Sequence, residues 1–204
     1  MICSYKYYFT FLLTLIVITS CGGGSSGPDI VYLPPIYSDD YSDIKALEGN
    51  KEIIIINAID SNNRRVSYSI TGGDDEELFS LAADGKLTFL KTPDYESPHD
   101  TGLNNIYKID IEASAGLDIT PQSILIKVED AIEGRVVDGP LVGARVFIDN
   151  NDNSILDFDE KSTITNSEGF FYINKKSVDC IGACGKKLIA QGGLDKQTNR
   201  KSNL

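Results

Sequence analysis

Apolar and polar residues alternate with a period of two along much of the chain after position 45, and this period is typical of β-strands. In residues 107–113, Tyr, Ile, Ile and Ala alternate with Lys, Asp and Glu. The alternation predicts an antiparallel strand with one buried face. Similar shorter runs occupy 52–58, 66–70, 86–90 and 123–128. Clusters of Gly, Asn, Asp and Pro separate them, and no comparable helical pattern occurs, so residues 45–130 are expected to form a β-sandwich.

A second group of strands is expected in residues 131–204. The stretch "IEGRVVDGPLVGARVFID" predicts two strands broken by the turn "DGP", and "TITNSEGFFYI" predicts two more around "NSEG". The fold class is therefore all-β, with two small β-sandwich modules. The tail "QGGLDKQTNRKSNL" is polar and has no clear closing strand. It leaves open that the second module is incomplete and that the chain continues in a longer protein.

The N-terminus has the pattern of an export signal. Lys6 precedes an apolar run at 7–18 that is too short to span a bilayer. The following "ITSC" resembles the lipobox of bacterial lipoproteins, and this resemblance implies a signal peptide at 1–20 and a lipid anchor on Cys21. The alternatives are an ordinary cleaved signal and a short buried helix. The Gly- and Ser-rich start of the linker 21–44 would act as a flexible tether. The resemblance to lipoproteins implies a location on a bacterial membrane, at the outer membrane or cell surface.

The remaining cysteines are assigned by elimination. Cys3 belongs to the discarded signal and Cys21 to the anchor, so Cys180 and Cys184 of "CIGAC" are left in the mature chain. Export exposes them to oxidising conditions, and we expect a local disulfide, with two free thiols as the alternative.

Charge and composition exclude several functions. The chain carries 30 acidic and 19 basic side chains, a net charge of −11, which opposes nucleic-acid binding and suits a hard cation. His99 is the only histidine, and no zinc-protease, P-loop or dinucleotide motif is present. A G-x-S-x-G match at residues 23–27 lies in the tether. We therefore expect no enzyme activity and no small-molecule substrate.

Six features follow one another along residues 46–130. They are Glu48 before the first strand, "AID" at 58–60, "VSYSI" at 66–70, "LFSLAADGKLTF", "PDYE" at 93–96 and "IKVED" at 126–130. Together they resemble a cadherin repeat. The resemblance implies a calcium site formed by Glu48, Asp94, Glu96 and Asp130, and a role for Asp60 at the opposite pole. "IEASAG" has Ala115 where the family usually has Asp, and "VEDAIEG" lacks the usual D-x-N-D-N linker, so this site is expected to be the weaker of two.

The segment 132–191 resembles the carboxypeptidase-regulatory or transthyretin-like sandwiches and the B-type repeats of bacterial surface proteins. Within it, residues 149–160, "DNNDNSILDFDE", match the spacing of the twelve-position EF-hand calcium loop. The predicted ligands are Asp149, Asn151, Asn153, the Ile155 carbonyl, Asp157 and Glu160. Ser154 replaces the glycine that the loop usually has at its sharp turn. The alternative is a solvated acidic turn.

These observations together predict a calcium-binding, lipid-anchored cell-surface protein that supports cell adhesion or surface architecture. Its expected partners are the membrane, through Cys21, and a cell-surface protein or polysaccharide. The alternative function is a passive structural spacer, or the N-terminal part of a larger surface lipoprotein.

Overall fold

The computed structural model describes residues 31–137, 140–178 and 186–202. Internal contacts divide the chain into Met1–Val31 and Tyr32–Leu204, and all the described strands belong to the second part. The expected signal peptide, Cys21, the Gly-rich start of the tether, Cys180 and Cys184 lie outside the described residues. None of the described residues forms a helix with the length and hydropathy that crossing a bilayer requires.

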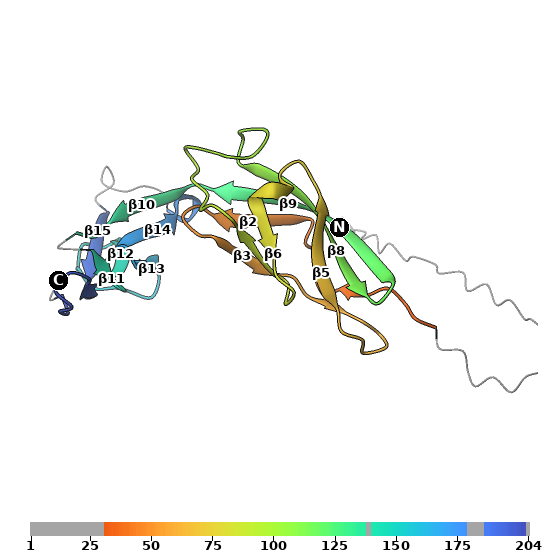
Figure 1. The fold of residues 1–204 in the computed structure, drawn as a ribbon. Coiled ribbons are helices and arrows are strands. Elements are labelled where there is room, and N and C mark those ends of the chain that lie inside the picture. The colour runs from red at the N-terminus through yellow and green to blue at the C-terminus, as the bar shows by residue number, and fades with distance from the viewer. Residues whose placement is uncertain (1–30, 138–139, 179–185, 203–204) are drawn as a thin grey trace, which may run out of the picture. The chain divides into compact units, whose positions relative to one another are not determined.

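A four-stranded sheet is the largest element of the structure (Figure 1). Its strands run in the order β2 (Asp43–Leu47), β9 (Asp118–Glu129), β8 (Ile106–Ala115) and β5 (Ser67–Gly72). β2 and β9 are parallel, whereas the other neighbours are antiparallel. β8 and β9 form a hairpin in which Ala115 pairs with Asp118, and Gly116 in the turn has a φ of 71°. Glycine adopts this left-handed conformation without the steric cost that a Cβ brings.

A three-stranded sheet completes the first sandwich. It consists of β3 (Glu52–Ile55), β7 (Lys86–Phe89) and β6 (Phe79–Leu81), the last preceded by the 3-10 turn Glu76–Leu78. β1 (Ile36–Tyr37) pairs with β4 (Ala58–Ile59). The buried core includes Phe79, Phe89 and Tyr107, whose rings contact one another edge-on or tilted. Such aromatic contacts contribute beyond the burial of their area.

The second group of strands forms three smaller sheets. β10 (Ala131–Arg135) pairs with β14 (Phe170–Asn174), and β11 (Leu141–Val142) pairs with β16 (Leu194–Asp195). β12 (Arg145–Asp149) lies between β13 (Ser162–Ile164) and β15 (Lys187–Gln191). A small core formed by Val146, Ile148, Phe171 and Ile173 packs β12 against β14.

The all-β fold class is confirmed, and each of the five runs in the first module overlaps a strand. In β8, the side chains of Tyr107, Ile109, Ile111 and Ala113 are buried, as the alternation predicts. Two details of the second module differ from the strands expected from the sequence. "LVGARVFID" forms two strands, because Gly143 turns the chain with a φ of 70°. The polar tail also contributes the short strand β16, which pairs with β11.

Candidate metal centre

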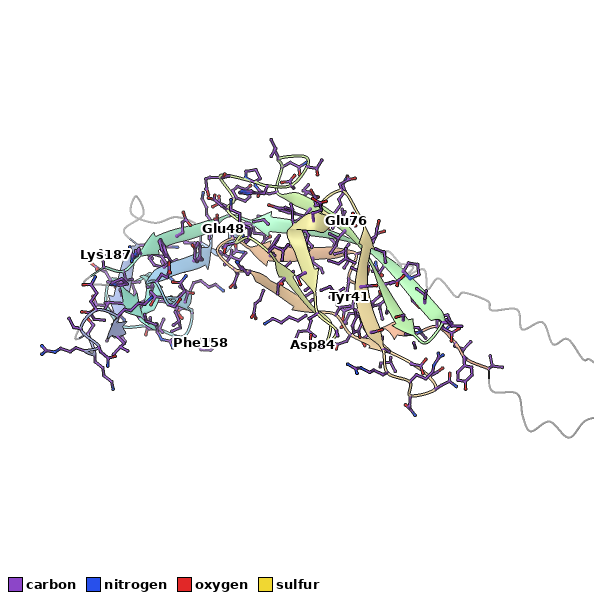
Figure 2. The ribbon with its side chains drawn as sticks, in the orientation of Figure 1. Tyr41, Glu48, Glu76, Asp84, Phe158 and Lys187 are labelled. Carbon is purple, nitrogen blue, oxygen red and sulfur yellow. The ribbon has the colours of Figure 1, made fainter. Side chains whose placement is uncertain are left out.

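Three carboxylates gather at the end of β9. They belong to Glu48, Glu96 and Asp130, and one oxygen from each lies within 4.8 Å of the others. The parallel pairing of β2 and β9 places Leu47 opposite Glu129, so the next residues, Glu48 and Asp130, leave the sheet at the same edge. Glu96 comes from the loop after β7. Figure 2 labels Glu48 at this edge.

Glu48 is the buried member of the group, with 1% of its surface exposed. Its Oε2 accepts a hydrogen bond from the backbone N–H of Tyr95 at 2.8 Å, and its Oε1 accepts one from that of Ala131 at 2.6 Å. Burial raises the pKa of Glu48 although these two bonds lower it, and the nearby charges of Glu96 and Glu133 raise it further. The bond to Tyr95 also holds the loop that carries Glu96 beside Glu48.

The two carboxylate oxygens of Asp130 differ in their hydrogen bonding. Oδ2 lies 2.7 Å from the ammonium of Lys175. Oδ1 is buried and has no hydrogen-bond partner among the described residues. A buried carboxylate oxygen without a partner is costly, and a hard cation such as calcium would satisfy it. The donor set at this edge therefore fits calcium.

The surroundings of the group are strongly negative. Burial raises the pKa of Glu133, and the charges of Glu96, Asp94 and Asp130 raise it further. Asp94, the fourth predicted ligand, is outside the closely spaced group, and its Oδ1 accepts the backbone N–H of Ser97 at 3.1 Å. The structure thus brings three of the four predicted residues together. Glu133 and Lys175 could not be identified from the sequence, because their positions on β10 and after β14 carry no motif.

The predicted calcium loop, residues 149–160, connects the neighbouring antiparallel strands β12 and β13. Asp149 has no exposed surface, and its carboxylate accepts backbone N–H groups from Asn151, Asn153 and Ser154. Burial opposes ionisation of Asp149, but these N–H groups prevail and lower its pKa. Ser154 has a φ of 59°, so the backbone at the expected glycine position is left-handed. The loop therefore curls around Asp149.

The side chains of this loop already bind one another. The amide nitrogens of Asn151 and Asn153 each donate to Asp157 Oδ2 at 2.8 Å. Glu160 accepts the backbone N–H groups of Asn150 and Asp157. Among the described residues, Asp149, Asp157 and Glu160 do not form a second group of three closely spaced carboxylates. Calcium binding here requires both amides to turn their oxygens inward. The ligand role of these residues, and of the exposed Ile155, stays a prediction.

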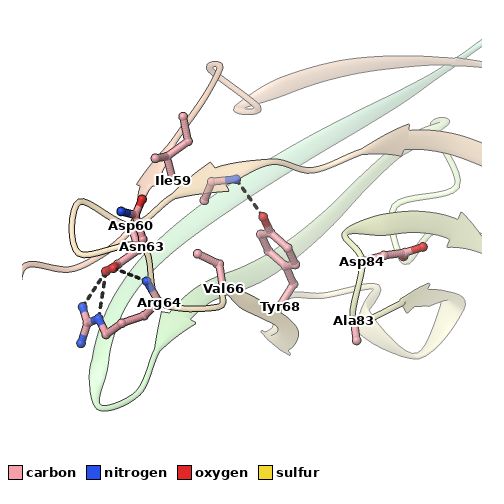
Figure 3. A pocket seen from close by; sticks show the side chains of 9 residues that line it. Ile59, Asp60, Asn63, Arg64, Val66, Tyr68, Ala83 and Asp84 are labelled. Carbon is pink, nitrogen blue, oxygen red and sulfur yellow. Dashed lines mark hydrogen bonds and ion pairs between the residues drawn. The ribbon is translucent and has the colours of Figure 1, made fainter.

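Asp60, which was expected to act at the opposite pole, lies beside a cavity of about 460 Å³ (Figure 3). Its Oδ1 accepts from Arg64 Nη2 at 2.6 Å, and its Oδ2 accepts from the backbone N–H groups of Asn62 and Arg64. Arg64 Nη1 also bonds Asp118 at 2.6 Å. The hydrogen bond from Arg64 is the main reason that the pKa of Asp60 falls to about 2. The carboxylate that was expected to act at the opposite pole thus forms an ion pair with Arg64.

We predict that Asp60→Asn lowers the melting temperature by several degrees at pH 7, because Arg64 loses one of its two charged partners. The folded-state pKa of about 2 lies below the ordinary value of 3.8. Ionised Asp60 therefore stabilises the fold above pH 3.8, and this contribution disappears as the pH falls toward 2. Thermal melts of both proteins across this range should converge at the acidic end. Asp39→Asn, at an exposed position, is the control. A difference that is constant with pH would contradict this prediction.

Comparison with known proteins gives matches only among solved structures. No protein-family model and no curated protein matches the chain. Drosophila N-cadherin EC1-3 matches at 20% identity and a TM-score of 0.41, over 48% of this chain and 34% of that one. Human protocadherin-24 EC1-2 matches at 15% identity and a TM-score of 0.42, over 84% of this chain and 93% of that one. This chain spans about a third of the N-cadherin structure. The fold assignment rests on the strand pairings described above, because both TM-scores are below 0.5.

Proposed function

We propose that this chain is an exported, calcium-binding β protein of adhesion type, located at the cell surface. The observation that carries the proposal is the meeting of Glu48, Glu96 and Asp130 around a buried, unpartnered oxygen of Asp130. Three carboxylates at one point repel one another, and a divalent oxygen-seeking cation offsets that repulsion.

In this proposal, calcium takes oxygens from the three carboxylates. Calcium binds six to eight oxygens, and water and backbone carbonyls supply those that the carboxylates do not. The ion would connect the end of β2, the loop after β7 and the end of β9. Its effect is to stiffen this edge of the protein. A stiffened module suits adhesion or surface architecture, and the chain itself performs no chemical step.

Calcium titration of the full chain tests the proposal. Millimolar calcium should raise the melting temperature, and Glu96→Gln should lose part of that rise. Glu96 is suited to this test because it is the exposed member of the group, so the fold should tolerate its replacement. Glu77→Gln, at an exposed position outside the group, is the matched control and should respond like the original protein. Equal responses of the two variants would exclude calcium binding by the three carboxylates.

The proposed location depends on the lipid anchor at Cys21. We predict that Cys21→Ala releases the protein from the membrane or leaves it unprocessed, because acyl chains supply most of the membrane affinity of such anchors. Fractionation of cells that express each form measures the outcome. Unchanged retention of the variant in the membrane fraction would rule out this anchor.

The proposed partner is a protein or polysaccharide on a cell surface. Cell aggregation that requires both the protein and calcium would support adhesion. Aggregation that is unaffected by calcium and by the protein would support the passive spacer instead.

A further inference from the structure

A lysine from a distant part of the sequence contacts the carboxylate group. The 3-10 turn η2 (Lys175–Ser177) follows β14, and Lys175 Nζ lies 2.7 Å from Asp130 Oδ2. The backbone N–H of Lys175 also donates to the Asp130 carbonyl at 3.0 Å. Both ends of Lys175 are therefore bound to the same residue, which fixes where its ammonium lies.

The neighbouring lysine provides a contrast. Lys176 Nζ lies 3.0 Å from Glu129 Oε1, and Glu129 is not part of the group of three carboxylates. Both lysines line a cavity of about 220 Å³ together with Tyr95 and Asp130. The two side chains are similarly exposed, at 59% for Lys175 and 71% for Lys176. They differ in which carboxylate they neutralise.

The ammonium of Lys175 lies beside the group of three carboxylates. It binds Asp130 Oδ2 at 2.7 Å, and an oxygen of Asp130 lies within 4.8 Å of an oxygen of Glu48 and of Glu96. One ammonium faces three carboxylates, so the group keeps a net negative charge when all are ionised. The unpartnered oxygen of Asp130 remains available on the other side of the carboxylate.

We propose that Lys175 is a tethered cation of the Glu48, Glu96 and Asp130 group, and that it holds the group together without metal and competes with calcium for Asp130. This inference rests on the proposed function. Calcium bound to Asp130 through both oxygens must displace the ammonium from Oδ2. Calcium bound through Oδ1 alone is repelled by an ammonium on the same carboxylate. In either case Lys175 weakens calcium binding.

Replacing Lys175 with methionine keeps most of the side-chain length and removes the charge. In metal-free buffer, Lys175→Met should melt at a lower temperature than Lys176→Met, because the three carboxylates lose their only tethered counter-charge among the described residues. In calcium, Lys175→Met should bind about fivefold more tightly than the parent, which is the scale of one partly exposed charge interaction. Lys176→Met should bind calcium with nearly the parental affinity.

Isothermal titration with calcium chloride measures these affinities in the full chain. All variants carry Glu160→Gln, which removes a predicted ligand of the loop at 149–160 and isolates the carboxylate group. If the parent binds calcium and both lysine variants bind equally well, the inference is wrong and the proposed function stands. If only Lys175→Met binds calcium, Lys175 excludes the ion from the original protein and the proposed function fails at this group. If no variant binds calcium, both are wrong.

Discussion

Glu48→Ala should lower the free energy of unfolding by about 2–4 kcal/mol even without calcium, because two buried backbone N–H groups lose their acceptor. The two groups belong to Tyr95 and Ala131, which bond opposite oxygens of Glu48 at 2.8 and 2.6 Å. Loss of a fully buried side chain also leaves a cavity. Urea denaturation in the presence of a chelator measures the effect.

The exposed Glu96 is the matched control for this prediction. Glu96→Ala removes the same side chain from the same group of carboxylates and should cost less than about 1 kcal/mol. Both variants should lose the calcium response of the group. We therefore expect Glu48 to have a structural role in addition to the ligand role proposed for it, and only its replacement should weaken the metal-free protein. An equal cost for the two variants would show that the backbone bonds of Glu48 contribute little.

The strands of the first module could be predicted because burial imposes a period of two on the sequence. Tyr107, Ile109 and Ile111 face the core, and the alternation alone shows this. The lengths of the strands were harder to predict from the sequence. β9 begins at Asp118, well before the predicted start at 123, because it follows its partner β8 through a tight turn at Gly116. Pairing with a neighbour lengthens a strand past the point where its own pattern is clear.

The candidate site could be predicted only in part. Glu48, Glu96 and Asp130 are predicted ligands because they match the pattern of a cadherin repeat. Their proximity in space, however, depends on the parallel register of β2 and β9. Lys175 was missed because it is 45 residues from Asp130 in sequence, and only the path of β10 and β14 brings it there. A partner supplied by tertiary structure leaves no local signal. The same holds for the salt bridge that Arg64 makes with Asp118, 54 residues away.

The loop at 149–160 shows the same division between local and tertiary information. Its curled backbone could be predicted from the spacing of Asp149, Asn151 and Asn153, because short polar side chains accept nearby N–H groups. The orientation of the Asn151 and Asn153 amides, which both donate to Asp157, could not be predicted from the sequence. These amide bonds make the loop a folded structure without metal. To bind in this loop, calcium must therefore replace the hydrogen bonds from Asn151 and Asn153 to Asp157 as well as form its own bonds to oxygen.

Calcium binding by this loop should stabilise the protein, and Glu160→Gln should remove most of that effect. Extracellular loops of this kind bind calcium with a Kd of about 10⁻⁴ to 10⁻³ M, and Ser154 in place of glycine favours the weak end. At about ten times the Kd, binding to the folded state alone adds about 1.4 kcal/mol, or several degrees in melting temperature. Magnesium should not reproduce the shift, because it requires octahedral geometry and retains its waters.

Two further variants separate ligand loss from backbone strain. Ser154→Gly should stabilise the metal-free protein by about 1 kcal/mol, because Ser154 has a φ of 59° that glycine adopts at no steric cost. It should also tighten calcium binding. Asp159→Asn removes a charge from an exposed loop position outside the ligand pattern and should keep the full calcium response. Thermal melts in calcium, in magnesium and in chelator compare all three variants. If calcium shifts Glu160→Gln and Asp159→Asn equally, the loop is a solvated acidic turn, and any stabilisation comes from the three carboxylates at the end of β9.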